Sequence, residues 1–139
     1  MFKNFKLFAV VALLAATTMF FVSCSKESQI EGKWKVTRAY SSDADFSDDK
    51  GETWNFKDGG TGSATLFGME FDMDWAVSGD NLTIELDGVY YSGYRAKCTG
   101  DFDIETLNSS DMELEGTWTI KVDGETEARV KVEYDMDKK

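Results

Sequence analysis

The feature that most constrains the fold of this chain is a strict alternation of apolar and polar residues. In the segment MEFDMDWAV, every second residue from Met69 to Val77 is apolar, and the residues between them are acidic or small. Successive side chains of a strand point to opposite faces, so a period of two predicts strands with one buried face. The segments NLTIELD, DMELEGTWTIKV and EARVKVEYDM repeat this pattern.

Short turn signals rich in Gly, Asn and Asp separate the alternating segments, and the chain contains no Pro. One of these signals is LDG at residues 86–88. If residues 92–107 form one bent strand the chain has eight strands, and a break at Gly100 would make nine. The predicted strands cover residues 31–40, 51–57, 61–67, 69–78, 81–87, 92–100, 101–107, 112–122 and 126–135.

The short connections favour antiparallel pairing between strands that follow one another in sequence. A sheet with a single apolar face must close on itself or pack against a second sheet. The sequence therefore predicts an all-β fold, in which an antiparallel up-and-down meander of about eight strands closes into a small β-barrel over residues 31–139. A two-sheet sandwich is the alternative.

The first 23 residues have the composition of a secretory signal peptide. Lys3 and Lys6 precede an apolar run over residues 7–22, and Ser23 is a small residue directly before Cys24. The apolar run is shorter than the roughly 20 residues that a membrane-spanning helix needs. A permanent membrane-anchor helix is the alternative interpretation.

The sequence FVSC at residues 21–24 resembles the bacterial lipobox, in which the Cys receives diacylglycerol and becomes the new N-terminus. The resemblance implies a signal peptide over 1–23, acylation of Cys24, and a short polar tether over residues 24–30. It also implies attachment to the membrane through this lipid. The expected location is the cell envelope, as an outer-membrane lipoprotein on the periplasmic side or the cell surface.

The charge of the chain excludes one class of partner. Residues 1–23 hold two lysines and no acid, so the remainder carries 13 basic and 26 acidic residues, a net charge of −13. Such a surface repels phosphate backbones, so we expect no binding to nucleic acid.

Two Gly-x-Trp patterns occur in predicted strands, Gly32/Trp34 in IEGKWKVT and Gly116/Trp118 in LEGTWTIK. The first resembles the Gly-x-Trp signature of lipocalins. Together with TWNFKDGGTGSA and WAVSGDNLTIEL, the chain resembles the short lipocalin-like lipoproteins of Bacteroidetes. The resemblance implies that these Trp residues plug the barrel structurally. An Arg also packs across the plug Trp in lipocalins, but the parity of Arg129 places it outside.

The same resemblance implies a non-catalytic protein that binds a small apolar molecule inside its barrel. The alternative is a filled barrel that recognises an envelope protein or a glycan with its outer surface. That surface would use VYYSGY, residues 89–94, and the acidic loop SSDADFSDDKGE. By parity, the residues that would line an internal site are Trp54, Phe56, Phe71, Met73, Trp75, Tyr94 and Tyr134.

The residue types argue against an enzyme. The chain has no His, so it lacks a Ser-His-Asp triad and a His-based zinc site, and it has no Gly-rich phosphate loop. Asp72 and Asp74 share a strand face, which is typical of a solvated surface. Cys98 alternates with apolar residues and is expected in the core.

The acidic loop offers oxygen ligands of the kind that Ca²⁺ uses. Its spacing fails the EF-hand pattern, so we expect a solvated loop at the mouth of the barrel. No metal and no cofactor is expected.

Overall fold

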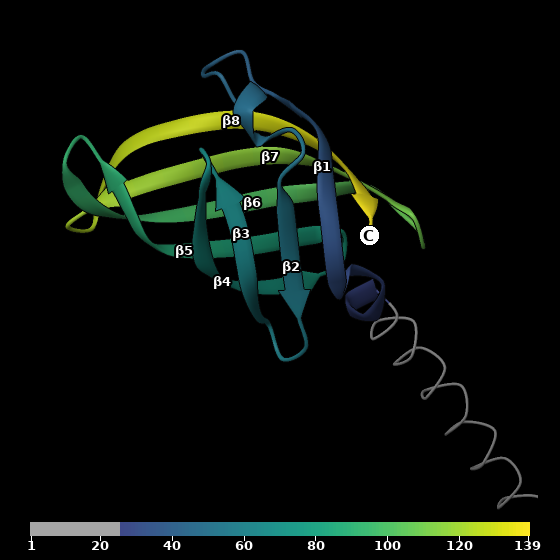
Figure 1. Cartoon of the computed structure of the whole chain (residues 1–139). Helices are drawn as coiled ribbons and strands as arrows, with labels where there is room; N and C mark the ends of the chain where they lie inside the picture. The colour runs from purple at the N-terminus through teal and green to yellow at the C-terminus, as the bar shows by residue number, and fades with distance from the viewer. Residues whose placement is uncertain (1–25) are drawn as a thin grey trace, which may run out of the picture.

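Eight strands follow one another around a closed barrel in the computed structural model, which describes residues 26–139 (Figure 1). Each strand pairs antiparallel with its sequence neighbours, and this confirms the predicted meander. The strands are β1 (Gly32–Tyr40), β2 (Thr53–Lys57), β3 (Thr61–Leu66), β4 (Met69–Ser78), β5 (Asn81–Tyr91), β6 (Tyr94–Leu107), β7 (Asp111–Val122) and β8 (Glu125–Lys138).

The first and last strands close the barrel. β1 pairs antiparallel with β8, from Trp34 opposite Lys138 to Tyr40 opposite Glu133. This pairing removes the two free edges that an open eight-stranded sheet would expose. The sandwich alternative is therefore wrong.

Local irregularities bend the long strands around the barrel. The register shifts within β1 between Val36 and Arg38, and within β5 between Asp87 and Val89. Such bulges increase local twist and change which residues face inward. Gly88, with a φ of 81°, lies in the second bulge. The turn predicted at residues 86–88 is therefore wrong, since β5 continues to Tyr91.

The remaining strand boundaries lie close to the predicted ones. Residues 94–107 form the single strand β6, so the count is eight and Gly100 does not break the strand. Helical structure, which the alternation did not predict, is confined to residues 26–30 and to the 3-10 helix η1 (Ser47–Asp49) in the described chain.

The two ends of the barrel differ. At the closed end, residues 26–30 form a helical turn beside the start of β1 (Figure 1). At the other end, which we call the mouth, lie the β1–β2 loop at 41–52 and the β3–β4, β5–β6 and β7–β8 turns, because every odd-numbered strand runs toward it.

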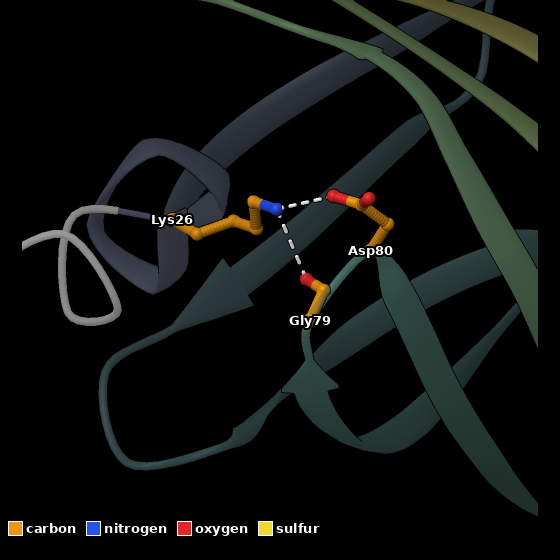
Figure 2. A network of polar contacts seen from close by, with 3 residues as sticks. All are labelled: Lys26, Gly79 and Asp80. Atoms are coloured by element: carbon orange, nitrogen blue, oxygen red, sulfur yellow. Dashed lines mark hydrogen bonds and ion pairs between the residues drawn. The ribbon is translucent and has the colours of Figure 1, made fainter.

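The helical turn is fastened to the closed end. Figure 2 shows Lys26 reaching the β4–β5 turn, where its ammonium donates to the carbonyl of Gly79 at 3.1 Å and pairs with Asp80. Ile30 is buried, and its carbonyl accepts a hydrogen bond of 2.7 Å from the indole N–H of Trp34. Residues 26–30 of the expected tether therefore pack as part of the folded domain.

One glycine is required by the close approach of two strands. A Cβ on Gly116 of β7 would lie 2.0 Å from the carbonyl oxygen of Asp101 and 2.7 Å from the Cα of Phe102, both backbone atoms of β6. Backbone in a central ladder moves only if the strands separate. The missing side chain of Gly116 therefore lets the backbone of β6 lie close to that of β7.

We predict that Gly116→Ala lowers the free energy of unfolding by about 3 kcal/mol, the upper end of the usual cost of overpacking. Gly68→Ala is the control, because a Cβ there meets open space and the backbone has a φ of 79°. The control should cost about 1 kcal/mol, from the left-handed conformation alone. Urea denaturation measures both, and equal losses would contradict the steric explanation.

Candidate functional site

Six of the seven predicted lining residues lie inside the barrel, as their parity predicted. All six are buried in the hydrophobic core. They come from β2, β4 and β8. These residues are Trp54, Phe56, Phe71, Met73, Trp75 and Tyr134.

The interior aromatic side chains pack against one another. The ring centroid of Trp54 lies 4.9 Å from that of Tyr134 and 6.2 Å from that of Trp118. Phe56 packs edge-on against Trp75 at 5.4 Å, and Phe102 against Trp118 at 5.1 Å. These separations are typical of direct aromatic contact. The rings that would line an internal site thus occupy the interior themselves.

The polar atoms of this aromatic cluster are also paired within the protein. The indole N–H of Trp118 donates to the hydroxyl of Tyr134 at 2.8 Å. The indoles of Trp54 and Trp75 donate to the carbonyls of Thr65 at 3.1 Å and Thr61 at 2.8 Å. All four tryptophans lie within the described chain, and each indole N–H donates to an acceptor of the protein. None of these four N–H groups is therefore available to bind a ligand.

Tyr94 does not line the interior, and its prediction as an internal ligand-binding residue is wrong. It is the first residue of β6 and is 65 % exposed. Its parity matches that of buried Ala96 and Cys98, but Tyr94 begins β6 at the tip of the β5–β6 hairpin. Figure 1 shows this hairpin projecting from the end of the barrel. The parity of a residue tells which face of its strand the side chain points to. It does not tell whether the rest of the barrel covers that face at this position along the strand.

Trp34 of the Gly32/Trp34 pattern is buried at the closed end of the barrel, where Lys138 packs against it. Trp34 is buried, and the ammonium of Lys138 lies 4.8 Å from the centroid of its ring. The same ammonium donates to the carbonyls of Gln29 at 3.0 Å and Glu31 at 2.6 Å. Burial lowers the pKa of Lys138. The alternation did not reveal Lys138, because the contact depends on how residues 26–31 fold across the end.

The glycines of the two Gly-x-Trp patterns make room for different groups. A Cβ on Gly32 would meet Cε of Lys138 at 2.9 Å, so this glycine makes room for a lysine and not for a Trp ring. Trp118 is not a second plug at an end of the barrel. It packs inside the aromatic cluster, seven residues along β7 from the closed end.

The acidic loop does not gather its carboxylates around one point. Asp43 accepts from the backbone N–H of Lys131 at 3.1 Å, and Asp45 accepts from that of Ser47 at 2.9 Å. The side chain of Ser47 and then its backbone N–H lower the pKa of Asp45. Asp48 is exposed, whereas Asp49 is fully buried. Within residues 26–139, no three acidic or Cys side chains converge to hold a metal ion. The expectation of a solvated loop is wrong for Asp49.

Asp72, Asp74 and Cys98 lie on the faces of their strands that the alternation predicted. Asp72 and Asp74 are exposed on the outer face of β4. Cys98 is a buried free thiol, and burial raises its pKa to about 12, so it stays protonated and unreactive. Cys24 lies outside the described residues, and its acylation remains a prediction.

The exposed aromatic residues of VYYSGY lie on the hairpin at the mouth. Tyr90 of β5 is 66 % exposed and pairs in register with Arg95 of β6. Tyr94 lines a surface groove of about 240 Å³ between the β5–β6 and β7–β8 turns, together with Val122 and the carboxylates of Asp123, Glu125 and Glu127. We call Tyr90, Tyr94 and these three acids the hairpin surface.

No family model, no curated protein and no solved structure matches this chain. The resemblance to lipocalins and to the lipobox therefore remains a prediction from the residues quoted above. Among the residues that the structure describes, no helix is both long and apolar enough to cross a membrane.

We predict that Tyr134→Phe lowers the free energy of unfolding by about 2 kcal/mol, because it leaves the buried indole N–H of Trp118 without an acceptor. The matched control is Tyr94→Phe, which removes an exposed hydroxyl and should change stability by less than about 0.5 kcal/mol. Chemical denaturation compares the two. A Tyr134→Phe protein as stable as the control would show that the interior is not closely packed.

We predict that Lys138→Met loosens the closed end and costs about 1 kcal/mol, since it removes two hydrogen bonds and the contact with Trp34. Lys139→Met is the neighbouring control, because the side chain of Lys139 makes a single hydrogen bond, to the hydroxyl of Thr53, and is exposed. Amide exchange at residues 26–31 should accelerate only in Lys138→Met. Acceleration in both variants would mean that a general loss of positive charge is responsible.

Proposed function

We propose that this protein is a non-catalytic binding module of the cell envelope that recognises a basic surface of another envelope protein through its mouth. The observation that carries the proposal is the contrast between the two sets of predicted binding residues. The interior aromatics are buried against one another, whereas Tyr90 and Tyr94 are exposed on opposite faces of the β5–β6 hairpin, and Tyr94 lines a groove.

The composition of the hairpin surface supports a protein partner. Tyrosines supply large contact area at little entropic cost and are enriched at the centre of protein interfaces. Asp123, Glu125 and Glu127 flank Tyr94, and the chain as a whole has a formal net charge of −11. Complementary charge would speed the encounter with a basic partner and oppose binding to an acidic one.

The position of the mouth supports an outward-facing binding site. Lys26 lies at the closed end, and Cys24 precedes it by two residues, a reach of about 7 Å at most. A lipid on Cys24 would hold the closed end against the membrane. The hairpin surface, at the opposite end of the barrel, would then face away from the membrane (Figure 1).

Two other partners follow from the sequence. A glycan could stack on the same tyrosines, and this would be a second class of ligand for the same surface. A small apolar ligand inside the barrel was the first expectation from the lipocalin resemblance. The mutual packing of the interior rings favours the outer surface over that internal site.

We predict that the double variant Tyr90→Ala/Tyr94→Ala loses at least tenfold in affinity for the envelope partner. The wild-type full chain would be immobilised and exposed to a detergent-solubilised envelope fraction, and the retained protein would be identified and titrated by surface plasmon resonance. Binding should weaken as salt rises, because charge steers it.

The matched control is Tyr40→Ala, which removes another exposed tyrosine, 52 % exposed at the end of β1. Its affinity should equal that of the wild type. Equal losses in the control and the double variant would contradict the hairpin surface as the site. Retention of a purified neutral glycan, and of no protein, would replace the proposed partner class.

A further inference from the structure

The β1–β2 loop lies across the mouth and is held there by a buried aromatic side chain. Phe46 is buried, and its ring centroid lies 5.1 Å from that of Phe67 in the β3–β4 turn and 6.3 Å from that of Tyr134 in β8. Asp43 ties the same loop to the backbone of Lys131. The loop therefore covers the end of the aromatic cluster that faces the mouth.

Asp49 is the one buried charged side chain of the described chain, and it makes a further contact between this loop and the barrel. Its side chain is 0 % exposed. One carboxylate oxygen, Oδ1, accepts a 2.8 Å hydrogen bond from the backbone N–H of Phe67. The other oxygen, Oδ2, is buried without a partner. A buried carboxylate with an unpaired oxygen is costly when it is ionised and much less so when it is neutral.

We propose that Asp49 is a pH-sensitive latch, which holds the β1–β2 loop closed over the mouth when its carboxyl is protonated and releases the loop when it ionises. Opening would take Asp49 and Phe46 into solvent and break the hydrogen bond from Phe67. It would uncover the end of the aromatic cluster at Tyr134 and reshape the mouth beside the hairpin surface. The latch is independent of which partner binds there.

The charges that face Asp49 oppose its ionisation. Glu52 and Asp48 lie on its own loop, and Tyr134 faces it from β8. Desolvation is the largest cause that raises the pKa of Asp49 from 3.8 to about 6, and the two acids add to it, against the lowering effect of the Phe67 hydrogen bond. Burial also raises the pKa of Tyr134 well above 10, so this tyrosine stays neutral.

Within the part of the chain that the structure describes, no basic side chain forms an ion pair with Asp49. The ion pairs found within residues 26–139 join Lys26 to Asp80, Arg38 to Glu133, and Lys97 to Glu85. Asp49 is in none of them. An ionised Asp49 would thus have the single hydrogen bond from Phe67 and no cation to stabilise it inside the closed loop.

The Asp49 carboxyl binds its proton more tightly in the closed loop than in the open loop, and this difference sets the direction of the pH dependence. In the open loop, the pKa of Asp49 returns toward its ordinary 3.8, whereas in the closed loop it is about 6. The closed state is favoured most below about pH 4 and loses this advantage as the pH rises to about 6. A difference of about two pKa units corresponds to a roughly 100-fold change in the opening equilibrium.

Amide hydrogen exchange of the full chain tests the latch. The reporter is the N–H of Phe67, which is freed when the loop opens. Its protection factor, corrected for the intrinsic exchange rate at each pH, should fall by up to roughly 100-fold between pH 4 and pH 7. The N–H of Trp75, bonded to Gly60 at the closed end, should keep its protection factor over the same range.

Two adjacent variants separate the latch from general effects of charge. Asp49→Asn keeps an oxygen that accepts from Phe67 but does not ionise, so the protection of Phe67 should become independent of pH. Asp48→Asn removes the exposed neighbouring charge and should keep the wild-type fall. The proposal is overturned if the wild-type protection of Phe67 is flat between pH 4 and pH 7, or if Asp49→Asn retains the same fall.

Discussion

The width of an eight-stranded barrel is the constraint on which the rest of this structure depends. Such a barrel is just wide enough to be filled by side chains or to hold one small ligand. Closure by the β1–β8 pairing fixes that width, and the rings of Trp54, Trp118 and Tyr134 then meet across it. Because side chains occupy the interior and the N-terminal turn covers the closed end, the function that we propose uses the mouth.

Much of the fold could be predicted from the sequence because period-two alternation reports directly which face of a strand is buried. The antiparallel meander, its closure into a barrel, and the inward positions of Trp54, Phe56 and Trp75 all follow from it. Tyr94 was misplaced for a physical reason. Its face was correct, but the strands β5 and β6 extend past the barrel, where no opposite wall covers that face.

The features that alternation could not predict depend on how loops cross the ends of the barrel. Lys138 meets Trp34 only because residues 26–31 fold back over the closed end. Asp49 reads as one more acid in a solvated loop, and its burial depends on Phe46 drawing that loop over the mouth. Gly88 has the signature of a turn and forms a bulge instead. These features depend on segments that are far apart in the sequence, so no pattern among neighbouring residues predicts them.

Native mass spectrometry of the protein, purified after incubation with a total lipid extract of the envelope, tests most directly whether the barrel is filled. The filled barrel predicts the mass of the protein with no apolar molecule added, at every lipid concentration. A one-to-one adduct would contradict it, if the adduct persists in Tyr90→Ala/Tyr94→Ala and disappears in Trp75→Asp. Such a result would mean that an apolar ligand binds among the interior rings, as the resemblance to lipocalins implies.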